Sequence, residues 1–284
     1  LRPTGTRLLS VARAAPAADA RAVVERAREL GFDGLTTQRD PIRVYPAADV
    51  AANVIGFLGT PLADGTPQPL AGFERTFDAE LSGTDGSARY SVAAGQKIPL
   101  GEQTVVEAVD GRDLTTTLDR ELQWYVQRVL RQTVYDARAD SGVAVVLDSR
   151  TGEVLSLADF PTYDANDPLE ADEADLGSRA MSDVYEPGSV QKVLTLGALV
   201  DAGRVTPRTR LTVPPSLQRQ DRAIGDWFDH GTINLTLAGV LAKSSNIGTV
   251  LAADKFEGDE LRDYLTAFGL GEPTGVGVRG ESPG

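Results

Sequence analysis

The spacing of apolar residues divides the chain into two parts of different character. Up to about residue 110, one strong helical pattern covers Ala17–Leu30, and Gly31 suits its C-terminal cap. The rest of this part predicts short strands and turns, and Asp85-Gly86 predicts a turn between strands at 77–81 and 88–92. We therefore expect a mixed, strand-rich domain over residues 1–110.

Residues 111–284 begin with a helix set between strand patterns. Leu114–Leu118 predicts a strand, and Asp119 is placed to cap a helix that runs to about Ala137. The helix face expected to be buried carries Leu122, Tyr125, Val126, Val129 and Leu130.

A β-hairpin is predicted next. Val143–Leu147 and Glu153–Leu157 are joined by a turn that Gly152 closes. The first strand is apolar throughout, so both of its faces are expected to be covered.

A polar, acidic loop follows over residues 161–183, and then come helical patterns at about 189–202, 235–243, 247–255 and 259–268. A strand pair preceded by one helix and followed by several is typical of the α+β class. The sequence therefore predicts an α+β fold with domains at 1–110 and 111–284.

Composition excludes several classes of function. The chain carries 28 Lys and Arg against 41 Asp and Glu, and its net charge of −13 disfavours nucleic acid as a partner because like charges repel. Cysteine is absent, which excludes disulfides, thiolate nucleophiles and Cys-based zinc sites. The single histidine, His230, excludes a multi-histidine metal site. No stretch approaches the ~18–20 apolar residues of a membrane span.

Ser189 and Lys192 are the first candidates for chemistry. Pro187 and Gly188 end the preceding loop, and an almost entirely apolar helix follows, with Lys192 on the face of Ser189. Burial of that helix is expected to lower the pKa of the lysine, and a neutral amine beside a hydroxyl can take its proton without histidine. The backbone N–H of Ser189 is placed to donate to an oxyanion. The alternative is a plain helix cap.

Two further segments invite the same question. Ser244 and Asn246 lie two residues apart between helical patterns, so that one hydroxyl can relay a proton and one amide can bind a substrate; the alternative is a helix C-cap followed by an N-cap. Asp226–His230 contains the only histidine, which we expect to be hydrogen-bonded locally in a turn. The acidic run at 164–175 lacks the spacing of a calcium loop.

The two serine motifs together resemble the penicilloyl serine transferases, whose sites carry Ser-x-x-Lys, Ser-x-Asn and Lys-Thr-Gly. The flanking segments are similar to those of class B penicillin-binding proteins, namely Tyr185–Ser189, Asp148–Leu155, Pro161–Asn166, Ser244–Thr249 and Phe268–Val276. Arg43–Pro46, Asn53–Phe57 and Gly72–Gly86 resemble the non-catalytic pedestal of that family. The likeness covers Arg43–Gly284 and is greatest to the septal enzymes of actinobacteria, with the elongation type as the alternative.

The resemblance implies a peptidoglycan D,D-transpeptidase without metal or cofactor, at the extracytoplasmic face of the cell membrane. Ser189 would attack the penultimate D-Ala carbonyl of a stem peptide ending in D-Ala-D-Ala, and Lys192 would be its general base. Ser244 would relay protons and Asn246 would hold the substrate amide. β-Lactams would acylate the same serine, and a membrane glycosyltransferase and divisome proteins would be partners.

The sequence departs from the family pattern in one motif. Lys255 is the last lysine, so no Lys-Thr-Gly occurs, and we interpret residues 111–284 as a C-terminally truncated transpeptidase domain. The membrane anchor, an N-terminal transmembrane helix, is expected to lie outside this sequence. Arg43 and Glu74 are expected to pair within the pedestal. Two alternatives remain: a non-catalytic divisome scaffold of the same fold, and a β-lactam-hydrolysing or β-lactam-sensing relative, which the pedestal-like residues disfavour.

Overall fold

The computed structural model describes residues 11–12, 15–37, 42–62, 66–90, 92–93, 96–97 and 103–283. In this part of the chain, helices alternate with strands that pair antiparallel, which confirms the predicted α+β class. The described helices include none that is long and apolar enough to cross a membrane.

The first part of the chain consists of short elements. Its helices are α1 (Ala17–Glu29), α2 (Ala52–Ile55), α3 (Gly72–Thr76) and α4 (Asp78–Leu81). Its strands form the antiparallel pairs β1 (Leu58–Gly59) with β2 (Gln68–Pro69), β3 (Ser87–Tyr90) with β6 (Gln103–Val106), and β4 (Val92–Ala93) with β5 (Gln96–Lys97).

The second part has longer helices. It begins with α5 (Arg120–Ala137), the hairpin β7 (Gly142–Leu147) with β8 (Val154–Phe160), two 3₁₀ turns η1 (Pro168–Glu170) and η2 (Glu173–Asp175), and α6 (Arg179–Ser182). It continues with the 3₁₀ turn η3 (Gly188–Val190), α7 (Gln191–Asp201), β9 (Arg210–Val213), β10 (Leu217–Arg219), β11 (Arg222–Ile224), β12 (Ile233–Thr236), α8 (Leu237–Ala242), α9 (Asn246–Ala253) and α10 (Glu260–Ala267). β9 pairs with β12, and β10 pairs with β11.

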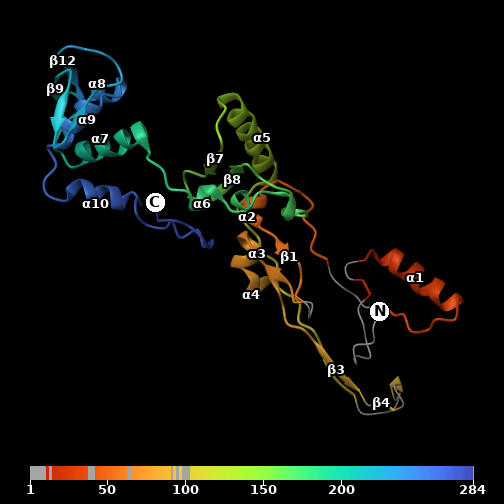
Figure 1. Cartoon of the computed structure of the whole chain (residues 1–284). Helices are drawn as coiled ribbons and strands as arrows, with labels where there is room; N and C mark the ends of the chain where they lie inside the picture. The colour runs from red at the N-terminus through yellow and green to blue at the C-terminus, as the bar shows by residue number, and fades with distance from the viewer. Residues whose placement is uncertain are drawn as a thin grey trace.

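The described elements follow one another along an elongated molecule (Figure 1). Helices α7–α10 lie with β9 and β12 at one end, and α5 lies with β7 and β8 in the middle. The short helices α2–α4 lie beside this middle group, and β3 and β4 extend away from it. The candidate serine Ser189 lies in η3, which leads directly into α7, so it belongs to the group of elements at the end opposite to β4.

Two sequence-based predictions of strands are wrong. Residues 78–81 are helical, and β3 pairs with β6 instead of with 77–81. Asp78 and Glu80 occupy the first turn of α4, where the helix dipole stabilises negative charge. Residues 114–118 form no strand, although the Thr117 hydroxyl donates to Val154 O at 2.6 Å. The helix expected at about 235–243 is confirmed as α8, which begins at Leu237 because the Thr236 side chain caps it.

The buried face of α5 also differs from the prediction. Asp119 caps the helix as predicted, with its Oδ1 accepting from Leu122 N at 2.8 Å. Tyr125 and Val129 are exposed, and the buried positions are Gln123, Gln127, Leu130 and Val134. Gln123 faces the hairpin, whereas Gln127 faces the segment before α2, where its Oε1 accepts from Ala51 N and its Nε2 donates to Asp49 O.

Gln123 is buried because its amide satisfies the backbone of β8. Its Nε2 donates to Leu157 O, and its Oε1 accepts from Leu157 N and from the Ser156 hydroxyl, each at 2.8 Å. A count of apolar residues cannot anticipate this, because buried polar groups are stabilised by the partners they find.

β7 is covered on one face only, which contradicts the prediction that both faces are covered. Its burial alternates, and Val143, Val145 and Leu147 are exposed within the described part of the chain. The opposite side of the hairpin packs on α5, where Leu130 and Val134 contact Ala158. The outer face of β7 is exposed because none of the described helices or strands packs over Val143, Val145 and Leu147.

Residues 45–57 are fastened to the second part of the chain. Phe57 packs edge-on against Tyr163 with ring centroids 5.7 Å apart, and the Tyr163 hydroxyl donates to Ala52 O at 3.0 Å. The buried Asn53 amide donates to Asp175 O and to the carbonyl of residue 177 at 2.7 and 2.8 Å. These contacts join segments more than 100 residues apart, so the two parts share a core.

Arg43 and Glu74 pair as the sequence predicts. The Arg43 Nε lies 2.5 Å from Glu74 Oε1, and the Glu74 side chain is only 5% exposed. Burial raises the pKa of the nearby Tyr45 phenol to about 12, and the charge of Glu74 adds to this effect. The pair holds α3 against the segment that carries Tyr45.

Candidate active site

Ser189 and Lys192 are positioned by the start of α7. Gly188 adopts a left-handed backbone (φ 59°), which favours glycine, and Ser189 follows in the turn η3 that leads directly into the helix. Ser189 is exposed, whereas Lys192 is only 8% exposed. The helix buries Leu196 and Leu199 against Leu237 and Val240 of α8, which fixes its orientation under the site.

Ser244–Asn246 form the turn between α8 and α9. Ser244 takes the left-handed conformation (φ 51°), and its N–H and that of Ser245 donate to the last carbonyls of α8, both at 3.0 Å. The buried Ser245 hydroxyl then caps α9 by accepting from Gly248 N at 2.8 Å. The cap interpretation is therefore confirmed, and the same turn directs the side chains of Ser244 and Asn246 toward α7.

Lys192 is the centre of the contacts that join the two motifs. Its Nζ lies 2.6 Å from Ser244 O, 2.7 Å from Asn246 Oδ1, 3.0 Å from Ser244 Oγ and 3.3 Å from Ser189 Oγ. The Ser244 hydroxyl in turn donates to Ser189 Oγ at 3.0 Å. All four residues predicted for the site thus lie within one hydrogen-bonded group.

The four contacts of Lys192 differ in chemical kind. The Ser244 carbonyl and the Asn246 amide oxygen can only accept, so they take two protons from Nζ. The remaining neighbours are hydroxyls, which can donate to a neutral amine or accept from an ammonium. Burial lowers the pKa of Lys192, in the direction predicted from the sequence, and the charge of Asp226 opposes this shift. The geometry therefore suits an amine that takes a proton from a serine hydroxyl.

Asn246 is held in one orientation. Its Nδ2 donates to Gly225 O at 2.9 Å, which turns its Oδ1 toward Lys192. The side chain itself remains exposed, so it stays accessible to a bound molecule.

Asp226 contacts the Ser244–Asn246 turn, whereas the sequence pointed to the 226–230 segment only for its histidine. Its side chain is fully buried and accepts from the Ser245 hydroxyl at 2.6 Å and from Ile247 N at 3.0 Å. His230 is hydrogen-bonded locally as predicted, to Gly231 O and to Asp226, and it does not reach Ser189. No local spacing links Asp226 to Ser245, because the β12 strand and α8 separate them in the chain.

In the residues described by the structure, no group of three acidic or histidine side chains is arranged to hold a metal ion.

Residues 142–284 match the family model for the penicillin binding protein transpeptidase domain, and residues 5–116 match that for the penicillin-binding protein dimerisation domain. The penicillin-binding protein PbpB of Mycobacterium tuberculosis is 37% identical over 276 residues, 96% of this chain and 39% of the relative. The peptidoglycan D,D-transpeptidase FtsI of Escherichia coli is 31% identical over 258 residues, 90% of this chain and 42% of the relative.

Solved structures agree with these matches. The crystal structure of penicillin binding protein 3 from M. tuberculosis complexed with ampicillin is similar with a TM-score of 0.73 and 37% sequence identity, and the match covers 86% of this chain and 49% of that chain. The chain spans about two fifths of the length of the curated relatives it matches. The family model and the relatives confirm the resemblance read from the serine motifs: the chain belongs to the penicillin-binding protein transpeptidase family.

Proposed function

We propose that this chain supplies the acylating serine of a peptidoglycan D,D-transpeptidase that cross-links the cell wall at division. The observation that carries the proposal is the placement of the Lys192 amine between the hydroxyls of Ser189 and Ser244, with two acceptor oxygens holding its other protons. E. coli FtsI is named a peptidoglycan D,D-transpeptidase, which supports the same reaction here.

The reaction proceeds through two acyl transfers. The Ser189 proton passes to the neutral Lys192 amine, directly or through Ser244, as Oγ forms a bond to the penultimate D-Ala carbonyl carbon. The tetrahedral intermediate expels the terminal D-Ala, whose nitrogen takes the proton, and an ester remains on Ser189. An amine of a second stem peptide then attacks the ester, gives up its proton and restores the serine.

Two groups are placed to bind the substrate. Ser189 lies in the turn η3 that leads into α7, and its backbone N–H can donate to the oxyanion of the tetrahedral intermediate. Asn246 would hold the substrate amide beside the Ser189–Lys192 pair, since its side chain is exposed and its Oδ1 contacts Lys192.

β-Lactams are proposed to acylate Ser189 as strained amide mimics of the substrate. The structure of M. tuberculosis penicillin binding protein 3 complexed with ampicillin, to which this chain is similar, supports this. Ser189 Oγ would attack the carbonyl of the four-membered ring, the C–N bond of the ring would break, and the opened penicillin would remain attached to Oγ as an ester.

The name of E. coli FtsI, a peptidoglycan D,D-transpeptidase, supports a setting in cell-wall synthesis. We propose a site of action at the extracytoplasmic face of the cell membrane, with a transmembrane anchor on the whole protein and with a glycosyltransferase and division proteins as partners. We also propose a division of labour between residues 1–110, as a pedestal, and 111–284, as the acylating domain.

The test is intact-mass spectrometry after incubation with benzylpenicillin, with Ser189→Ala as control. The proposal expects one adduct per chain that persists for hours and is absent from Ser189→Ala. Rapid loss of the adduct with release of penicilloate would indicate a β-lactam-hydrolysing relative. A folded chain that forms no adduct would contradict the acylating role and favour a non-catalytic scaffold.

A further inference from the structure

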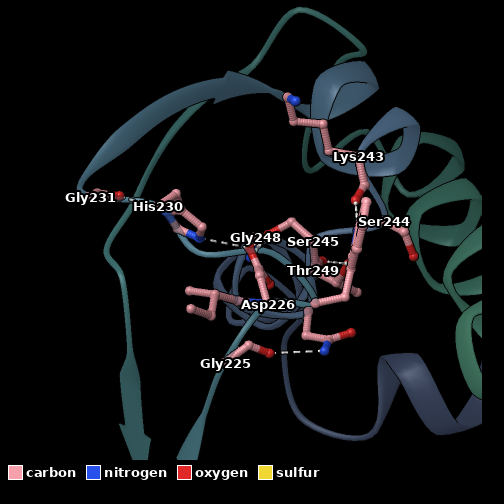
Figure 2. Close-up of polar contacts among 12 residues, drawn as sticks. Gly225, Asp226, His230, Gly231, Lys243, Ser244, Ser245, Gly248 and Thr249 are labelled. Carbon is pink, nitrogen blue, oxygen red and sulfur yellow. Dashed lines mark hydrogen bonds and ion pairs between the residues drawn. The ribbon is translucent and has the colours of Figure 1, made fainter.

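The Asp226 carboxylate lies beneath the turn that carries Ser244 and Asn246. Figure 2 shows it between His230 and that turn, at the start of α9. Its Oδ2 accepts from the Ser245 hydroxyl at 2.6 Å and its Oδ1 accepts from Ile247 N at 3.0 Å, with no part of the side chain exposed. The turn between the two helices is therefore tied from below to one buried charge.

His230 completes the shell around that charge. Its Nε2 lies 3.2 Å from Asp226 Oδ2, its Nδ1 lies 2.5 Å from Gly231 O, and its ring packs on Phe228 with centroids 4.9 Å apart. Each ring nitrogen of His230 thus lies within hydrogen-bond distance of one oxygen atom. The side chain is only 6% exposed, so it covers the carboxylate from water.

The same charge acts on Lys192 across the turn. The hydrogen-bond donors Ser245, Ile247 N, Asn246 N and His230 lower the pKa of Asp226 against the opposing effect of burial, so the group carries its charge at neutral pH. That charge favours the protonated form of Lys192. The titratable groups that the structure relates to Asp226 are thus His230 on its own segment and Lys192 on α7.

We propose that Asp226 is a positioning residue of the serine site: its buried carboxylate fixes the Ser244–Asn246 turn against Lys192, and its negative charge stabilises the proton that this lysine takes from Ser189. The inference rests on the proposed function, since it assigns Asp226 to the acylation that Ser189 performs. An asparagine at 226 keeps the shape but presents one acceptor oxygen and an NH₂ group to a shell that consists of donors. Asp226→Asn therefore loosens the turn and removes the charge together.

The test compares Asp226→Asn with Asp229→Asn in the full chain. Asp229 lies three residues away, is exposed, and loses the same charge on substitution. The first readout is the pH profile of benzylpenicillin acylation by rapid quench and mass spectrometry. The second is the ¹³Cε resonance of the lysines across a pH titration; the chain has four lysines, and Lys192→Arg identifies the signal of interest.

Asp226→Asn is expected to slow acylation by about 10- to 100-fold, because small displacements of reacting groups have effects of this size. It is also expected to move the Lys192 titration, and the rising limb of the acylation profile, to lower pH, since a neighbouring negative charge is lost. Asp229→Asn is expected to do neither. A slower reaction with an unmoved Lys192 titration would show a merely structural role and overturn the proposal.

Two further outcomes are separable. If the wild-type chain forms no penicillin adduct, the proposed function fails, but the Lys192 titration still decides the role of Asp226. If Asp226→Asn does not fold, Ser245→Ala replaces it, because it removes the shortest contact to the carboxylate and retains the charge. Acylation by Ser245→Ala at the wild-type rate would then overturn the proposal.

Discussion

Replacement of Gln123 by methionine tests how α5 holds the hairpin that follows it. Gln123 is 1% exposed, and its amide makes three hydrogen bonds to β8, two with the backbone of Leu157 and one with the Ser156 hydroxyl. Methionine has nearly the same length and shape but makes none of these bonds. The substitution therefore isolates the polar contribution from packing.

The magnitude follows from the groups left without partners. Both the N–H and the C=O of Leu157 lose the Gln123 amide, and an unsatisfied buried group costs about 1–3 kcal/mol. The apolar side chain offsets part of this, which leaves a loss of about 2–4 kcal/mol in the stability of the α5–hairpin unit. A loss of that size speeds amide exchange through local opening by about 30- to 1000-fold.

Hydrogen exchange of peptides from β8, read by mass spectrometry, measures this effect directly. Gln132→Met is the matched control, since Gln132 lies on the exposed side of the same helix and bonds only to Asp136, one turn on. It is expected to change exchange by less than about threefold, because such pairs contribute about 0.2–0.5 kcal/mol. Equal exchange of β8 in the two variants would refute the reasoning.

Three further predictions concern other contacts. Arg43→Ala leaves the buried Glu74 carboxylate unpaired and is expected to lower the free energy of unfolding by about 1–3 kcal/mol in urea titrations, while penicillin acylation stays at the wild-type level; unchanged stability would contradict it. In the wild type the Asn53 amide donates to the carbonyls of residues 175 and 177, and Asn53→Asp places a carboxylate against these two oxygens. The melting temperature of the variant should therefore fall at pH 7 and recover below about pH 4, where the new carboxyl is protonated. The lowered pKa of Asp226 means that its charge stabilises the fold above the unfolded pKa of about 4, and the stability advantage of the wild type over Asp226→Asn should shrink as the pH falls below that value; a gap that widens would show the opposite sign.

The sequence correctly predicted those helices, caps and hairpins that are determined by residues close to one another in the chain. The helix at 17–29, the Asp119 cap of α5 and the β7–β8 hairpin are each specified by residues within a few positions of one another. The serine motifs were predicted for the same reason, because Ser-x-x-Lys and Ser-x-Asn are short patterns.

What the sequence did not reveal are contacts between distant segments. β9 pairs with β12, although β10 and β11 lie between them in the chain, and the Asn53 amide donates to carbonyls more than 120 residues away. Gln123 was missed because burial was read from apolarity alone, although its amide has partners on β8. The contact of Asp226 with the turn was missed because its partner Ser245 reads as an ordinary cap, and only the fold shows the charge beneath it.

The central claim is that Ser189 forms an acyl-enzyme with a D-Ala substrate. The most direct measurement uses a thioester mimic, N-acyl-D-alanyl thioglycolate, whose carbonyl carbon stands for that of the penultimate D-Ala. The chain contains no cysteine, so any thiol released can be counted against a zero protein background. The account predicts a burst of one thiol per chain together with an acyl adduct on the peptide that contains Ser189, both lost in Ser189→Ala. Thiol release that persists in Ser189→Ala would contradict it, as would a folded chain that gives no burst.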